Sequence, residues 1–139
     1  MAIVQALANT FKDNLMATTA NLEANSLKVA LYDNTATLSS ATTAYAVANE
    51  VTGTNYTAGG EAMTGMAVTL DGSTAIFDAD NVSWANATVT AQAALIYNGS
   101  FSNAAIAVLD FGGNKTSTNG TFEIQFPNAN ASTALIRIT

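Results

Sequence analysis

The sequence predicts a mainly β domain, which we expect to be an antiparallel β-sandwich or barrel of about seven strands with an N-terminal α-helix packed on one sheet. Apolar residues recur every fourth position at the start of the chain and every second position from Leu27 onward. Turn-forming pairs such as Asp71-Gly72 and Asn98-Gly99 separate the alternating runs. The 139 residues contain no linker and no internal repeat, so residues 1–139 are expected to form a single domain.

The N-terminal segment, residues 1–16, is predicted to be helical over residues 3–16. Its apolar stripe recurs every four residues and consists of Ile3, Leu7, Phe11 and Leu15, with Val4 beside it. We expect this stripe to cover the protein's own sheet, and binding of a partner is the alternative.

The β domain is predicted to occupy residues 27–139, and its first strand is the alternating run after Ser26. A long irregular excursion, residues 34–64, follows this strand, and loops of such length are often functional. The run GGNKTSTNG is interpreted as a polar loop, and Pro127 ends a strand because proline has no N–H to donate. The later strands are predicted at residues 66–70, 75–77, 83–97, 104–111, 121–126 and 133–139.

The stretch SWANATVTAQAALIYNGS, residues 83–100, changes its pattern midway. Its first half alternates apolar with polar residues, whereas the run from Ala93 to Tyr97 is apolar throughout. The strand is therefore predicted to begin with one face in water and to end with both faces covered. We expect the N-terminal helix to provide the second cover, with a neighbouring subunit as the alternative.

The composition excludes most reactive chemistry. The chain contains no His and no Cys, so it cannot form a Ser-His-Asp triad, a thiol nucleophile, a disulfide or a zinc site built on those residues. The glycine-rich runs lack the spacing of a phosphate-binding loop. We therefore expect no enzymatic activity, no cofactor and no metal.

Acidic and aromatic residues suggest three further alternatives, each weaker than a structural role. Oxygens for calcium could come from Asp71, Asp78, Asp80 and Asn81, but these residues lack the EF-hand pattern and are typical of turns. No spacing in the sequence pairs the candidate glycosidase carboxylates Glu50, Glu61, Asp78, Asp110 and Glu123. A sugar-stacking surface is less favoured than packing in the sheets for Tyr32, Tyr45, Tyr56, Tyr97 and Trp84.

The charge balance argues against nucleic acid and membranes as partners. Ten acidic and four scattered basic residues give a net charge of -6, whereas phosphate binding needs clustered cations. No apolar run approaches the ~20 residues that span a bilayer, and the first residues lack the features of a signal peptide. Only 10% of the residues are charged, and a surface of Ala, Thr, Ser and Asn suits permanent contact with other proteins.

Six segments carry a resemblance to a known family: MAIVQALANTFKDNL, LKVALYDNTATLSSATTAY, NEVTGTNYTAGGEAMTG, SWANATVTAQAALIYN, AVLDFGG and TFEIQFP. In this order they resemble small virion structural proteins of tailed bacteriophages, over nearly the whole chain. The resemblance implies a capsid decoration, or cement, protein that binds the outer face of the major-capsid lattice and stabilises the head. It further implies two partners, the major capsid protein and the chain itself, with which it would form a trimer or dimer. The implied location is the capsid surface, and the implied place of synthesis is the host bacterial cytoplasm.

The alternative within the same family is a protein of the tail, neck or fibre, with host-glycan binding as its role. Contact with the capsid or another subunit is expected from the N-terminal segment and the 34–64 excursion, because neither is needed to complete the series of strands. The predicted contact residues are Ile3, Val4, Leu7, Phe11, Tyr45 and Tyr56.

Overall fold

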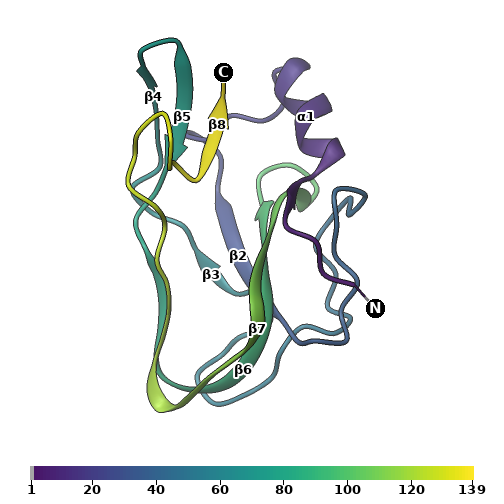
Figure 1. Ribbon diagram of the computed structural model, residues 1–139. Helices are drawn as coiled ribbons and strands as arrows, with labels where there is room; N and C mark the ends of the chain where they lie inside the picture. The colour runs from purple at the N-terminus through teal and green to yellow at the C-terminus, as the bar shows by residue number, and fades with distance from the viewer. Residues whose placement is uncertain (1) are drawn as a thin grey trace.

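The computed structural model describes residues 2–139, which form two open antiparallel sheets and one short helix (Figure 1). The elements are β1 (Ala6–Leu7), α1 (Asn9–Met16), β2 (Leu27–Tyr32), β3 (Glu61–Ala62), β4 (Ala67–Asp71), β5 (Thr74–Asp78), β6 (Val82–Asn98), β7 (Ala104–Ile124) and β8 (Ile136–Ile138). The larger sheet has the strand order β1-β7-β6-β2-β3, and the smaller sheet has the order β4-β5-β8. The prediction of a mainly β fold is confirmed, and the barrel alternative is wrong because both sheets have free edges.

The longest elements, β6 and β7, pair along their whole length and form the bent ribbon in the lower part of Figure 1. The predicted polar loop GGNKTSTNG is wrong, because β7 continues through it. Its hydroxyl residues pair with the threonine-rich first half of β6, and the side chains of Thr90 and Thr116 share a hydrogen bond of 2.9 Å. Gly112 and Asn119 have positive φ angles, and the ladder shifts its register at four places, which lets the ribbon bend.

The N-terminal helix is shorter than predicted, because only Asn9–Met16 is helical. Before it the chain is extended: the amide of Val4 donates to the carbonyl of Leu38, and β1 pairs with β7. The β-branched side chains of Ile3 and Val4 suit this extended pairing better than a helix. Met1 lies outside the described residues. The helix packs against β7, as predicted, and buries Phe11.

The second half of β6 is buried on both faces, as its sequence pattern predicts. Exposed residues alternate with buried ones up to Thr90, except that Ala85 and Asn86 are both exposed, whereas every residue from Ala93 to Asn98 is buried. This burial occurs within one chain, so a neighbouring subunit is not needed to provide it. Part of the cover comes from the 34–64 excursion, because the ring of Tyr45 stacks on that of Tyr97 with centroids 4.8 Å apart.

The smaller sheet begins with the predicted hairpin, in which Gly72 turns β4 into β5 with a φ of 63°. The last strand, predicted over residues 133–139, is limited to Ile136–Ile138. Turns precede it because the side-chain oxygen of Asn130 accepts the amides of Ser132 and Thr133.

The excursion approaches β2 closely at Gly60, which generates a test of the fold. Gly60 has a φ of 78°, and a Cβ at this position would overlap the carbonyl oxygen of Val29. Gly60→Ala is expected to lower the free energy of unfolding by about 3 kcal/mol, because it adds a backbone clash to left-handed strain.

The matched control is Gly72→Ala, which has a similar φ but nothing within 4 Å of the added Cβ. This control should lose only about 1 kcal/mol. Urea unfolding measures both values, and equal losses would contradict the close approach.

Candidate functional site

The six predicted contact residues lie mostly inside the fold. Phe11 is buried, and Ile3, Leu7, Tyr45 and Tyr56 are partly buried against the core. Val4 is the exception, because 53% of it is exposed. Their contact with a capsid or another subunit stays a prediction, but five of the six already pack within their own chain.

The most densely hydrogen-bonded polar group is the carboxylate of Glu50, which is only 8% exposed. Its Oε1 accepts the hydroxyl of Tyr45 at 2.6 Å. Its Oε2 accepts the hydroxyl of Tyr56 at 2.6 Å and the amide of Gly59 at 2.8 Å. Such a buried charge is tolerated only when strong hydrogen bonds replace its water shell, and these three donors do so.

All four tyrosines of the chain gather around this carboxylate. The hydroxyl of Tyr56 also accepts the amide of Leu31 on β2, so it links Glu50 to the larger sheet. The hydroxyl of Tyr97 on β6 donates to the carbonyl of Gly59 at 2.6 Å. That of Tyr32 on β2 donates to the carbonyl of Ala46 at 2.6 Å. We call Glu50 and these tyrosines the Glu50 cluster.

The Glu50 cluster keeps its phenols protonated. Burial and the hydrogen bond to Glu50 raise the pKa of Tyr45 to about 12. Burial and the same carboxylate raise the pKa of Tyr56 far above its ordinary value. Burial raises the pKa of Tyr32 and Tyr97 as well, with the nearby negative charge of Glu50 as a further cause. The cluster therefore holds the excursion on β2 and β6 through neutral donors on one anionic acceptor.

The prediction that the tyrosines pack in the fold is confirmed. The sequence pattern did not predict that they surround the carboxylate of Glu50. The relevant signal is the spacing of Tyr45, Glu50 and Tyr56, five and six residues apart in a segment without regular structure. Trp84 extends the aromatic packing, because its ring lies 5.9 Å from that of Tyr56 between centroids.

The three aspartates among the predicted calcium donors each accept a hydrogen bond from another residue of the chain. Asp71 accepts the amide of Ala131, Asp78 accepts the amide of Ala79, and Asp80 accepts the hydroxyl of Thr64. Within residues 2–139, no three His, Cys, Asp or Glu side chains come together in a way that could hold a metal ion. The predicted calcium donors are therefore not gathered into one site.

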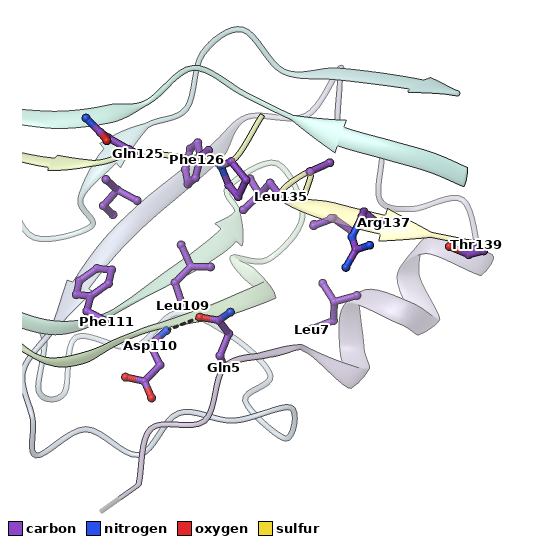
Figure 2. A pocket seen from close by; sticks show the side chains of 14 residues that line it. Gln5, Leu7, Leu109, Asp110, Phe111, Gln125, Phe126, Leu135, Arg137 and Thr139 are labelled. Carbon is purple, nitrogen blue, oxygen red and sulfur yellow. Dashed lines mark hydrogen bonds between the residues drawn. The ribbon is translucent and has the colours of Figure 1, made fainter. Parts of the chain in front are cut away.

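A groove of about 600 Å³ separates the two sheets where β8 faces β1 and β7 (Figure 2). Its walls include Leu7, Leu109, Phe126 and Leu135, and it carries a charge of each sign, on Asp110 and Arg137. At one side the side chain of Gln5 accepts the amide of Asp110 at 3.1 Å. The groove thus presents apolar and polar surface in about equal parts.

A second surface feature is the apolar face of the smaller sheet. The register places Leu70, Ala75 and Ile138 in one row across β4, β5 and β8. Leu70 is 75% exposed and Ile138 is 50% exposed. The adjacent row, Val68, Phe77 and Ile136, borders an apolar cleft of about 440 Å³ below α1. Ala75 and Ile138 also line this cleft, and Val68 is 42% exposed, so the face is buried at Phe77 and Ile136 and open along β4.

Among residues 2–139, no helix is both long and apolar enough to cross a membrane. Comparison with known protein families, with curated proteins and with solved structures gave no match.

The Glu50 cluster predicts unequal effects of removing its hydroxyl groups. Tyr56→Phe leaves the amide of Leu31 without a partner and removes one of the two donors to Oε2 of Glu50, so it should lower the free energy of unfolding by about 2–3 kcal/mol. Tyr32→Phe, the control, loses one bond to a carbonyl and should cost about 1 kcal/mol. Urea unfolding compares the two variants, and a smaller loss for Tyr56→Phe would refute the proposed link.

The raised pKa values predict alkaline unfolding. In the unfolded chain the tyrosines ionise near pH 10.0, whereas in the folded chain they remain neutral to higher pH. The folded state then binds more protons, so the free energy of unfolding should fall as the pH rises above about 10 toward about 12. Phenolate absorbance should appear together with loss of the near-ultraviolet circular dichroism. Ionisation near pH 10 in a chain that stays folded would contradict this prediction.

Proposed function

We propose that this chain is a non-enzymatic structural protein of a bacteriophage particle, a capsid decoration protein that binds the outer face of the major-capsid lattice. The observation that carries the proposal is the apolar row of Leu70, Ala75 and Ile138, in which the side chains of Leu70 and Ile138 are exposed. Contiguous apolar surface on a small protein is typical of a contact with another protein. The resemblance of the sequence to small virion proteins supplies the kind of partner.

The Glu50 carboxylate has a structural role inside the protein. The most buried carboxylate, that of Glu50, has both oxygens engaged by donors of its own chain. It therefore acts as a structural acceptor in the folded protein. A decoration protein needs no reactive group, because it stabilises a shell by adding contacts between neighbouring capsid subunits.

The repeated geometry of a capsid makes small contact surfaces effective. Each copy buries one apolar row, and symmetric self-association presents several rows at fixed positions. Simultaneous contacts multiply the affinity of each one. The strand β4 suits this use because all five of its residues are exposed. We therefore assign the contact to the smaller sheet in addition to the N-terminal segment.

Binding to the capsid of the phage that encodes the chain tests the proposal. Leu70→Lys should weaken co-sedimentation with purified capsids by about tenfold or more, because it places a charge in the apolar row. The control is Phe101→Lys, which changes an exposed apolar side chain between β6 and β7, outside the smaller sheet, the N-terminal segment and the excursion, and should bind like the wild type.

Electron microscopy of labelled particles gives the second readout. Many copies distributed over the head agree with decoration. A few copies confined to the tail, neck or one vertex would contradict it and favour the tail alternative. Wild-type protein that does not bind capsids, or equal effects of the two lysine substitutions, would also overturn the proposal.

A further inference from the structure

The groove between β8 and the β1–β7 edge has unpaired backbone groups on the β8 side. The amide of Val68 donates to the side chain of Glu23, so it points away from β5. Val68 and Phe77 therefore form a pair without mutual backbone hydrogen bonds. Because the N–H and C=O of Phe77 do not bond to β4, they point to the other neighbour, β8, where they bond to Ile136. One residue further along, Arg137 directs its own N–H and C=O away from β5, along the free edge of β8.

The opposite wall of the groove is also a strand edge. The carbonyl of Ile106 accepts the amide of Ala8, and the next outward position, Val108, pairs with β1. At Asp110 the main-chain pairing stops, and the side chain of Gln5 bonds to its amide instead. Figure 2 shows this bond at the margin of the groove. A side chain therefore occupies a position where a further strand would provide a carbonyl.

The side chains around the groove match an extended peptide. Leu7, Leu109 and Leu135 give apolar contacts, and successive side chains of a strand alternate in direction, so every second one can enter the groove. Figure 2 shows the guanidinium of Arg137 pointing across the groove toward Leu7. One of its nitrogens donates to the carbonyl of Ala131 at 3.0 Å. A guanidinium has five N–H donors, so others can bind a carboxylate.

We propose that this groove binds an extended segment of a partner protein as an added strand antiparallel to β8, with an acidic side chain of that segment on Arg137. Main-chain hydrogen bonds to Arg137 give the affinity, and the apolar walls and the guanidinium select the sequence. The site adjoins the apolar row of Leu70, Ala75 and Ile138, because Ile138 follows Arg137 on β8, but it uses the outward backbone groups of Arg137, whereas the row uses exposed side chains. The binding mode does not depend on a location in a virion.

A tethered strand tests the site in the full chain. Thr139 lies at the rim of the groove, and adding NGTVEVT after it makes a two-residue Asn-Gly hairpin that returns along β8. This register places the glutamate of the extension opposite Arg137. Tethering keeps the effective concentration of the strand high. The control extension PPTVEVT keeps the same strand residues but replaces Asn-Gly by two prolines, whose fixed negative φ excludes the positive φ angles of the hairpin turn.

Amide hydrogen exchange followed by NMR is the readout. The Arg137 amide should exchange about tenfold more slowly with NGTVEVT than with PPTVEVT, because only the first extension can fold back and give this amide a hydrogen bond. The Ile136 amide, which already bonds β5, serves as the internal reference. Equal exchange of Arg137 in the two extended chains would overturn the proposal.

A charge exchange tests the acidic preference. In the chain with Arg137, the extension NGTVEVT should slow exchange of the residue 137 amide and raise the melting temperature more than NGTVKVT does. In the Arg137→Glu variant, NGTVKVT should have the larger effect on both quantities. Equal protection by both extensions would overturn the assignment of an acidic side chain to Arg137.

Discussion

The carboxylate of Glu50 is the constraint on which the rest of the structure depends. A buried charge is unfavourable by several kcal/mol unless donors surround it, and here Tyr45, Tyr56 and Gly59 provide them. All three donors belong to the excursion, while the hydroxyl of Tyr56 reaches β2 at Leu31. Satisfying this one charge therefore fixes an irregular segment of the chain on the sheet.

Packing in the larger sheet follows from that attachment. With the excursion in place, Tyr45 covers Tyr97, and the second half of β6 is buried on both faces. Gly60 allows the excursion to approach the backbone of β2 because it has no side chain. Apolar surface that the excursion and α1 do not reach remains open on the smaller sheet, and this remaining surface supports the proposed function.

Local patterns predicted the strands well and the long-range pairings poorly. The change of pattern within β6 predicted its two-sided burial, because alternation reports directly on which faces are wet. The helix prediction failed over residues 3–8 because their hydrogen-bond partners, Leu38 and Ile106 among them, are distant in sequence. The loop prediction for residues 112–120 failed because polar strands lack an apolar signal. The Glu50 cluster was missed because its residues follow no helical or strand period.

Amide exchange at Gly59 tests the central claim most directly, because this amide donates to Glu50. If the cluster fixes the excursion to the sheet, Gly59 should exchange only through global unfolding, with the same opening free energy as Ile96 in the centre of β6. Exchange of Gly59 many times faster than that of Ile96, in a protein that otherwise stays folded, would show that the excursion opens independently and would contradict the account.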